Sequence, residues 1–234
     1  MSALRLLLVE DVPAAFAACV RAAQRRSGGR LRLAASGGTG GRACMDALVA
    51  GGLDWAGIEL FQVDERCVAG DSPDSNARSL LEALGPHRDE LAGFHAMDCA
   101  AGAAAYGAQL AAAGALDLVQ LGVGPDGHTA SLFPRSPALD APEEVLVAES
   151  RDPSGRNPHD RLTLTYGALG RARLCLVTVF GADKHDVLAR LAAGDDLPAA
   201  RLRGENTAWL VDPPAAQGLA TVPVPPALLA EEPA

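Results

Sequence analysis

The sequence lacks any apolar stretch of the ~20 residues that a membrane-spanning helix requires, because Gly, Asp or Gln interrupts its alanine-rich segments. It also lacks an excess of basic residues, since 20 Lys and Arg stand against 29 Asp and Glu and give a formal net charge of −9. Such a surface repels polyanions, so any anionic substrate must meet a local cluster of cations. We therefore expect neither a membrane nor a nucleic acid as partner.

Cysteine is scarce and forms no C-x-x-C motif. There are five cysteines, so that one is left over whatever the pairing: Cys19, Cys44, Cys67, Cys99 and Cys175. This usage predicts reduced thiols that serve as packing residues in a cytoplasmic protein. The apolar run at 6–9 is followed at once by Glu10 and Asp11, with no small-residue cleavage pattern, so secretion is not indicated.

Motifs for metal binding and for covalent catalysis are also missing. The histidines other than His128 have no H-x-x-x-H spacing with a carboxylate and lie near no pair of cysteines, so no metal site is predicted. No G-x-S-x-G nucleophile elbow is present. Covalent catalysis would have to use Ser36 or Ser131 without a recognisable context, and direct attack by water is the simpler expectation.

What the chain does contain is a regular alternation of short apolar runs and Ala/Leu-rich segments of helical period. The pattern predicts an α/β fold with a mostly parallel sheet and helices on both faces. We expect strands at 31–35, 58–64, 91–97, 117–124, 144–149, 161–165, 174–180 and 207–212, with early helices at 13–26, 42–50 and 76–84. With 49% hydrophobic residues, one domain over 1–234 is expected, ending in a loosely held Pro- and Ala-rich tail from 213.

A glycine-rich turn lies at 36–41, between the strand expected at 31–35 and the next helix. It reads SGGTGG. Because glycine lacks a Cβ, the backbone N–H groups of the turn can approach an anion closely, beside a helix N-terminus that favours negative charge. Ser36, Gly37, Gly38 and Thr39 are therefore candidate phosphate ligands. The run also suits an ordinary tight βα turn, and it matches neither G-x-G-x-x-G in register nor a P-loop.

The motif Asp64-Glu65-Arg66 comes where the strand expected at 58–64 ends. Ligands of open α/β sheets bind outside the carboxyl ends of the strands, so Asp64 is a candidate site residue. Arg66 is a candidate cation for an anionic substrate. The spacing leaves open a solvated acidic turn with one surface ion pair.

The sharpest local signal is the segment 121–134, LGVGPDGHTASLFP, which follows another expected strand. His128 can take a proton from water near neutral pH, and Asp126 can supply the carboxylate that holds the imidazole ring in the required tautomer. The alternative is an Asp-Gly turn with His128 as a cap or packing residue.

A lysine near the C-terminus stands at an unusual place. The segment FGADKHDVLARL puts Lys184 in the first turn of a helix expected to begin after Gly181. A cation there opposes the helix dipole, which makes better sense if an anion binds beside it, although an exposed lysine tolerates the mismatch at a cost of up to ~1 kcal/mol. Lys184 is therefore a candidate anion ligand.

Taken together, these motifs stand in the order and approximate spacing of one family, across residues 31 to about 190: SGGTGG, VDERCVAGDSPDSN, LGVGPDGHTASLFP, RLTLT and VFGADKHDVL. The sequence resembles the 6-phosphogluconolactonase family, which belongs to a wider group with the glucosamine-6-phosphate isomerases/deaminases. DGHTASLFP together with DER and SNAR is highly specific for the resemblance. It implies a Rossmann-like α/β sheet of the glucosamine-6-phosphate deaminase/6-phosphogluconolactonase type.

The resemblance also implies an activity, the hydrolysis of 6-phosphoglucono-1,5-lactone to 6-phosphogluconate in the second step of the oxidative pentose phosphate pathway. The partner would be this small sugar-phosphate lactone, with no cofactor and no metal. By resemblance, His128 is the general base that activates water and Asp126 orients it, with Asp64 in the same catalytic group. The 6-phosphate would be bound by Gly37, Gly38 and Thr39, with Lys184 as the main cation and Arg66 or Arg161 assisting.

The sequence departs from the family at two places. The family usually reads SGG-Ser/Thr-Thr-Pro, whereas this chain has Thr39-Gly40-Gly41, so that one hydroxyl and one proline are missing and ordering the loop costs more. The segment 151–160, RDPSGRNPHD, stands where the family more often has a proline-rich stretch.

Two other functions fit parts of the pattern. The amino-sugar-phosphate isomerases/deaminases resemble the chain at SGG, DE and DGH, but they continue to Asn-Glu-Pro, where this chain has Leu132-Phe133-Pro134, and phenylalanine accepts no proton. A non-catalytic sugar-phosphate sensor would need a partner domain, and no helix-turn-helix or basic patch is evident. We expect a lactonase that is a monomer or a small homo-oligomer.

Overall fold

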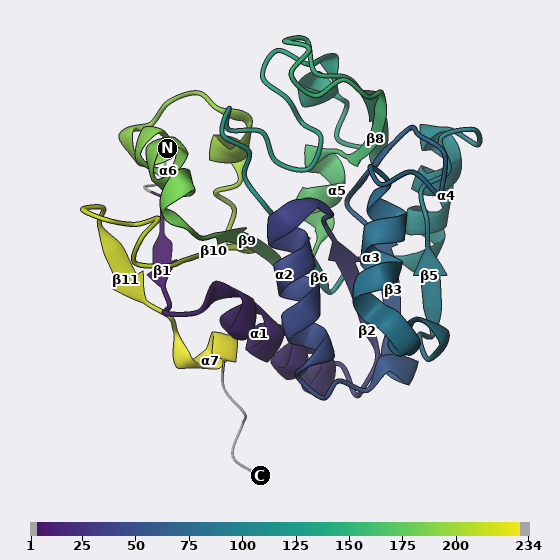
Figure 1. The fold of residues 1–234 in the computed structure, drawn as a ribbon, viewed down its shortest axis with the longest axis horizontal. Helices are drawn as coiled ribbons and strands as arrows, with labels where there is room; N and C mark the ends of the chain where they lie inside the picture. The colour runs from purple at the N-terminus through teal and green to yellow at the C-terminus, as the bar shows by residue number, and fades with distance from the viewer. Residues whose placement is uncertain (1–3, 230–234) are drawn as a thin grey trace.

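The main sheet of the protein consists of parallel strands. The computed structural model describes residues 4–229 (Figure 1), and its main sheet has eight strands in the order β11-β1-β10-β9-β6-β2-β3-β5, with every neighbouring pair parallel. The strands are β1 (Leu6–Leu8), β2 (Leu31–Ala35), β3 (Ile58–Gln62), β5 (Gly93–His95), β6 (Leu118–Leu121), β9 (Cys175–Val179), β10 (Thr207–Val211) and β11 (Thr221–Pro223). The predicted mostly parallel α/β architecture is confirmed.

Helices cover both faces of this sheet. The longer helices of one face are α1 (Val12–Arg26), α2 (Gly38–Val49) and α3 (Asn76–Leu84), and those of the other are α4 (Ala103–Ala113), α5 (Tyr166–Arg171) and α6 (His185–Ala193). Successive strand residues point to opposite faces, so Leu33 packs in the core of the first face and Ala34 in that of the second. This two-sided burial explains why the central strands read as apolar runs.

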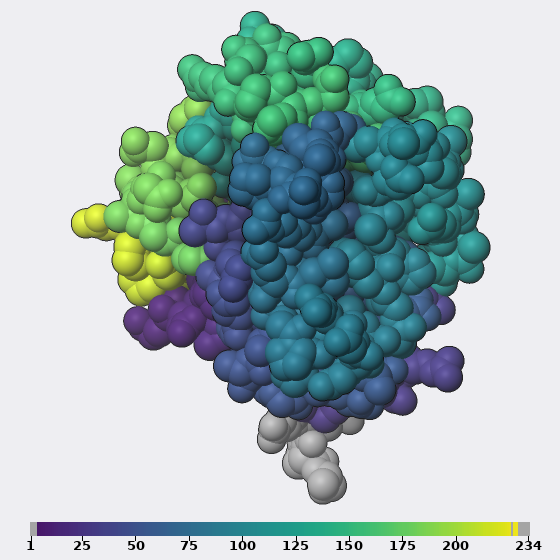
Figure 2. Space-filling model, turned by 45° about the vertical axis from the view of Figure 1, so that its right-hand side comes forward, coloured from purple at the N-terminus to yellow at the C-terminus, as the bar shows by residue number. Residues whose placement is uncertain are grey.

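A small antiparallel sheet lies beside the main one. Its strands are β4 (Asp64–Arg66), β7 (Val147–Ser150) and β8 (Arg161–Leu164), in the order β4-β8-β7. In the space-filling view, the green segment that includes β8 lies on top of the blue and teal segments (Figure 2). The prediction of one strand over 58–64 was wrong, because β3 ends at Gln62 and Asp64 pairs with Thr163 of β8 instead.

The C-terminal segment is attached to the domain at several points. β11 pairs in parallel with β1, Ala215 and Ala216 are buried, and the short helix α7 (Pro226–Leu229) lies against α1. The tail expected to be loose from 213 is therefore held by backbone pairing and packing up to 229, while 230–234 lie outside the described residues. Within residues 4–229, no helix is long and apolar enough to cross a membrane.

The cysteines do not all behave as the sequence predicted. Cys19, Cys44 and Cys175 are free and buried, as expected of packing residues, and burial raises the pKa of each thiol to about 12. Cys67 and Cys99, however, form a disulfide. The expectation of reduced thiols was wrong for this pair, because the fold brings together two loops that are separated by 32 residues in the sequence.

Candidate active site

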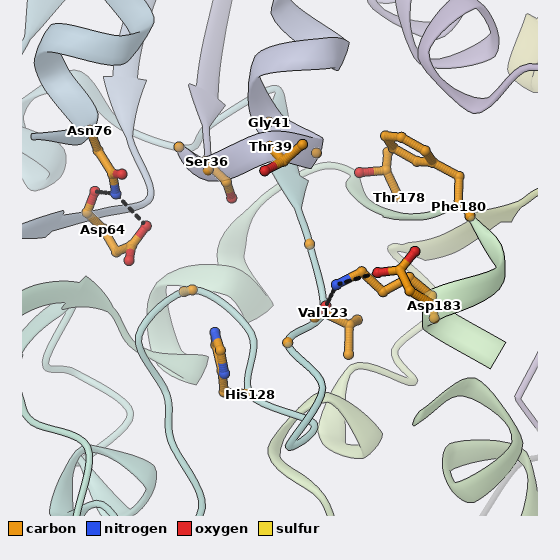
Figure 3. Close-up of a pocket in the computed structure, with 18 of the residues that line it drawn as sticks. Ser36, Thr39, Gly41, Asp64, Asn76, Val123, His128, Thr178, Phe180 and Asp183 are labelled. Carbon is orange, nitrogen blue, oxygen red and sulfur yellow. Dashed lines mark hydrogen bonds and ion pairs between the residues drawn. The ribbon is translucent and has the colours of Figure 1, made fainter. Parts of the chain in front are cut away.

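A cavity of about 540 Å³ opens at the carboxyl ends of the central parallel strands (Figure 3). This is the end of an open α/β sheet where ligands bind. The structure brings nine of the ten predicted site residues to its lining: Ser36, Gly37, Gly38, Thr39, Asp64, Arg66, His128, Arg161 and Lys184. The tenth, Asp126, contacts His128 from outside the lining. No residue of the divergent segment 151–160 lines this cavity.

The glycine-rich turn forms one wall of the cavity and leads into α2. Gly37 is the N-cap of α2 and offers no side-chain cap, so the first N–H groups of the helix are available to an anion. Gly38 has a φ of +71°, a conformation that favours glycine. The hydroxyl of Ser36 donates to the carbonyl oxygen of Gln120 at 2.9 Å, which fixes the turn to β6.

Asp64 lies at the centre of a buried polar network beside the glycine-rich turn, because its partner Asn76 packs directly against Gly37. Its Oδ1 accepts from the side-chain amide of Asn76 at 3.1 Å, and its Oδ2 accepts from the hydroxyl of Ser131 at 2.5 Å. The guanidinium of Arg161 stands 3.6 Å from Oδ2, and both side chains of this ion pair are more than nine-tenths buried. Both carboxylate oxygens are thus occupied, an arrangement that suits positioning of neighbouring groups more than proton transfer.

Glu65 is buried but serves the structure of α3. Its two oxygens accept hydrogen bonds from the backbone N–H groups of Arg66, Asn76 and Ala77 and from the side chains of Gln62 and Ser75. A carboxylate there satisfies the open N–H groups of the first turn of α3. The alternative of a solvated acidic turn is therefore wrong for this residue, which is 5% exposed.

Arg66 and Arg161 supply positive charge on the same side of the cavity. Arg66 donates from Nη1 to the carbonyl oxygen of Asp74 at 2.7 Å. Burial lowers the pKa of the Arg161 guanidinium, and the positive charge of Arg66 lowers it further, while Asp64 opposes both effects. Both guanidinium groups line the cavity, beside the carboxylates of Asp64 and Glu65, and can meet an anion there.

His128 and Asp126 form a close pair. Nδ1 of His128 lies 2.5 Å from Oδ1 of Asp126, and the same oxygen accepts from the backbone N–H of His128 at 3.2 Å. Burial would raise the pKa of the Asp126 carboxyl, but the hydrogen bond and charge of His128 outweigh it, so the pKa lies below its usual value. A carboxylate on Nδ1 leaves Nε2 as the free ring nitrogen, and the ring lies at the cavity (Figure 3).

Lys184 lines the cavity beside Asp183, which lies on the far side from Asp64 (Figure 3). Its Nζ donates to the carbonyl oxygen of Val123 at 3.1 Å and stands 3.9 Å from the carboxylate of Asp183. The helix predicted after Gly181 begins later, because a 3₁₀ turn spans Ala182–Lys184 and α6 starts at His185. Lys184 therefore precedes the helix instead of standing in its first turn.

Several lining residues did not stand out as candidates in the sequence. Asn76, Thr178, Phe180 and Asp183 also line the cavity. Asn76 begins α3 within the SNAR motif, so a signal for it existed, whereas Thr178 lies inside β9 and looks like an ordinary strand residue. Among the residues from 4 to 229, no three His, Cys, Asp or Glu side chains are grouped so as to hold a metal ion.

Comparison with known proteins assigns the chain to a family. The family model described as glucosamine-6-phosphate isomerases/6-phosphogluconolactonase matches residues 6–210, which include every predicted site residue. The chain belongs to this family.

Relatives within the family align along most of the chain. The 6-phosphogluconolactonase of Synechocystis sp. is 35% identical over 210 residues, which are 82% of this chain and 85% of that protein. The 6-phosphogluconolactonase of Streptomyces coelicolor is 32% identical over 228 residues, 86% of this chain and 87% of that protein. The GDH/6PGL endoplasmic bifunctional protein of Oryctolagus cuniculus is 39% identical over 197 residues, 77% of this chain but only 24% of that protein.

Solved structures of the family share the fold. The 6-phosphogluconolactonase from Trypanosoma brucei is 28% identical with a TM-score of 0.76 and covers 94% of this chain and 100% of its own. The 6-phosphogluconolactonase from Leishmania guyanensis is 25% identical with a TM-score of 0.78 and the same coverage. A monomeric glucosamine-6-phosphate deaminase, at 17% identity and a TM-score of 0.69, shares the fold alone.

Proposed function

We propose that this protein hydrolyses 6-phospho-D-glucono-1,5-lactone to 6-phospho-D-gluconate, in the oxidative pentose phosphate pathway, with water as the nucleophile. The observation that carries the proposal is the His128–Asp126 pair, whose imidazole lines the same cavity as the glycine-rich turn and three cations. Relatives named 6-phosphogluconolactonase over more than four-fifths of the chain support the same reaction. The proposed enzyme is cytoplasmic, needs no cofactor or metal, and is a monomer or a small homo-oligomer.

The proton transfers follow from the geometry of the pair. Asp126 accepts from the Nδ1–H of His128, so Nε2 is free to take a proton from a water molecule as that water attacks C1 of the lactone. The tetrahedral oxyanion is stabilised by Arg66 or by backbone N–H groups of the glycine loops. The protonated His128 then gives its proton to the ring oxygen as the C1–O5 bond breaks, and the open-chain acid is released.

The 6-phosphate binds on the glycine-rich side of the cavity in this proposal. The N–H groups of Gly37, Gly38 and Thr39 and the ammonium of Lys184 meet it there. Arg66 or Arg161 assists, since both also line the cavity. Asp64 acts as a positioning residue, because it ties Ser131, three residues after His128, to Asn76 and Arg161.

Packing next to His128 argues against a deaminase. Phe133 is fully buried, and its ring centroid lies 4.8 Å from that of the His128 imidazole. Phe133 lies at the position where the amino-sugar-phosphate deaminases have a glutamate. The guanidinium carbon of Arg161 lies 5.4 Å from the centre of the Phe133 ring, a cation–π contact that a carboxylate would replace with a charge pair.

The test is hydrolysis of freshly generated lactone in EDTA-treated buffer, with spontaneous opening subtracted, for the wild type and His128→Ala. Rapid wild-type turnover that falls by at least about 100-fold in the variant is the expected result. Unchanged folding of the variant is checked by its far-UV circular dichroism. No acceleration by the wild type refutes the lactonase, and binding of 6-phosphogluconate without turnover would instead indicate a sensor.

A further inference from the structure

The disulfide joins a loop at the active site to a loop outside it. Cys67 directly follows Arg66, which lines the cavity, and Cys99 lies in the turn between β5 and α4. The Cα atoms of the two cysteines are 5.5 Å apart. The covalent bond therefore begins one residue away from a proposed substrate ligand.

The segment 67–74, which connects β4 to the cap of α3, has almost no packing of its own. Each of its residues is exposed or only partly buried, so burial of apolar surface contributes little to its order. Two hydrogen bonds join it to the segment 151–160, one from the backbone N–H of Cys67 to the carbonyl oxygen of Asp160 at 2.8 Å and one between Asp74 and His159 at 3.1 Å. The guanidinium groups of Arg66 and Arg78 donate to the carbonyl oxygens of Asp74 and Asp71. These bonds lie near the surface, where they compete with water.

The other end of the disulfide is firmly placed. Met97, two residues before Cys99, is 5% exposed, and its N–H donates to the side chain of Gln62 in β3 at 2.7 Å. The backbone N–H of Gly102 donates to the carbonyl oxygen of Asp98 at 3.0 Å, which closes the turn before α4. The disulfide thus ties a weakly packed segment to one that is anchored in the core.

The segment 67–74 helps to hold Arg66, one of the three cations that line the cavity, in place. The carbonyl oxygen of Asp74, near the end of the segment, accepts from Nη1 of Arg66, whose other neighbour along the chain is the buried Glu65. Asn76, just beyond the segment, lines the cavity and donates to Asp64. A change in the position of the segment therefore acts on both Arg66 and Asn76.

Among the five cysteines, the two in the disulfide are the more accessible to solvent. Cys67 is exposed and Cys99 partly so, whereas the three free cysteines are buried. In a reducing cytoplasm, the compartment of the proposed function, a disulfide in an ordinary enzyme is more often a transient or sensing bond than a permanent one. Accessibility to a reductant is the condition for such a role.

We propose that Cys67–Cys99 is a thiol–disulfide exchange site, whose reduction by a dithiol loosens the segment 67–74 and lowers the affinity of the site for its sugar phosphate. One thiolate of the dithiol attacks a sulfur of the pair, the S–S bond breaks, and the other cysteine leaves as a thiolate that takes up a proton. The second thiol of the reductant resolves the mixed disulfide. Two protein thiols form, and the dithiol becomes a disulfide.

The first experiment measures whether the disulfide can be reduced in the native protein and whether reduction loosens the segment 67–74, and it needs no activity assay. The native protein is alkylated with and without prior dithiothreitol, and labelled cysteines are located by mass spectrometry; hydrogen exchange is followed over 66–76 in both states. We expect Cys67 and Cys99 to be labelled only after reduction, and the segment to exchange at least about tenfold faster then. Labelling of the pair without reductant, or equal exchange in the two states, overturns the proposal.

The second experiment depends on the proposed function and measures kinetics. On reduction KM should rise at least about threefold while kcat changes by less than about twofold, and reoxidation should reverse the change. Cys67→Ser and Cys99→Ser should each have the KM of the reduced enzyme, and dithiothreitol should not change it further. Agreement between the two variants shows that the effect comes from loss of the disulfide and not from loss of one particular side chain. An active enzyme with the same KM in both states overturns the proposal; an oxidised protein without activity refutes the lactonase and leaves hydrogen exchange to decide the exchange site.

Discussion

Gly124 and His128 are in direct contact across the active-site loop, because a Cβ at 124 would lie 2.1 Å from Cε1 of the His128 ring. The backbone N–H of Gly124 also donates to the carbonyl oxygen of His128 at 2.9 Å. The imidazole ring therefore packs against the backbone of Gly124, where any residue other than glycine would clash with it. The glycine is required here by close approach and not by a positive φ.

Gly124→Ala tests whether this close contact positions the His128 ring. The methyl group must displace the imidazole from its place beside Asp126, so kcat should fall by on the order of 100-fold, while KM changes little because phosphate binding lies elsewhere in the cavity. Gly122→Ala, at a lining position with open space for a Cβ, is the matched control and should keep most activity. Equal effects of the two substitutions on kcat would show that the loop and not the ring contact matters.

Ionisation of Asp126 makes the free energy of unfolding depend on pH in a direction that can be predicted. Its folded pKa lies below the ordinary 3.8, so ionisation of this carboxyl stabilises the fold above that value, and the contribution is lost as pH falls through the lower folded pKa. The difference in unfolding free energy between wild type and Asp126→Asn should shrink as pH falls below about 3.8. Urea denaturation across this range measures it, and a difference that grows on acidification would contradict the assignment.

The Asp64–Arg161 ion pair predicts non-additive stability. Removing the carboxylate alone in Asp64→Asn leaves a buried guanidinium without compensation and should destabilise the protein by about 3–5 kcal/mol. In the double variant Asp64→Asn/Arg161→Met the buried charge is gone, so much of that loss should be recovered. Urea unfolding of Asp64→Asn, Arg161→Met and the double variant gives a double-mutant cycle. If the two single losses in unfolding free energy simply add up in the double variant, the pair is not coupled.

Lys184 and Arg66 can be separated by their effects on binding. Lys184→Met removes the cation that we propose as the main phosphate ligand, so KM should rise at least about tenfold with a smaller change in kcat. Arg66→Met should reduce kcat more than Lys184→Met does if the guanidinium stabilises the oxyanion. Steady-state kinetics of both variants, with inorganic phosphate as a competitive inhibitor, distinguishes the roles.

Gly40 should tolerate a side chain, unlike its neighbour Gly38. An added Cβ at Gly40 meets only the Phe180 ring at 3.9 Å, an ordinary contact within the first turn of α2. Gly40→Ala should therefore stabilise the protein by about 0.5–1 kcal/mol and keep its activity. Gly38→Ala, at a φ of +71°, should be destabilising instead. Thermal unfolding of the two variants checks the order.

Part of this molecule could be predicted from its sequence because the evidence is local. The parallel strands were found since burial on both faces makes them continuous apolar runs, as in LCLVTVF around β9. Most of the predicted site residues line one cavity since their motifs follow strands, and the carboxyl ends of parallel strands meet at one edge of the sheet. A motif such as DGH also carries its own short-range geometry, so the pairing of Asp126 with His128 was expected and is observed.

Other features were decided by contacts between distant parts of the chain. The break after Gln62 arises because Asp64 pairs with Thr163 of β8, and nothing in the local sequence of β3 names that partner. Ser131 meets Asp64 across 67 residues, and Cys67 meets Cys99 across 32. Composition pointed to reduced thiols because it reports the usual state of cysteines in a compartment, not their separation in space.

The sequence by itself thus determined the alternation of strands and helices in the central part of the chain, the glycine-rich turn at 36–41, and the pairing of Asp126 with His128. Only the tertiary structure decided which of these groups are free to act. In the folded protein both carboxylate oxygens of Asp64 accept hydrogen bonds, and Glu65 accepts from the first N–H groups of α3. The Phe133 ring packs against His128. The physical reason is that hydrogen bonding and burial depend on every neighbour in space, whereas periodicity and motif report only the neighbours along the chain.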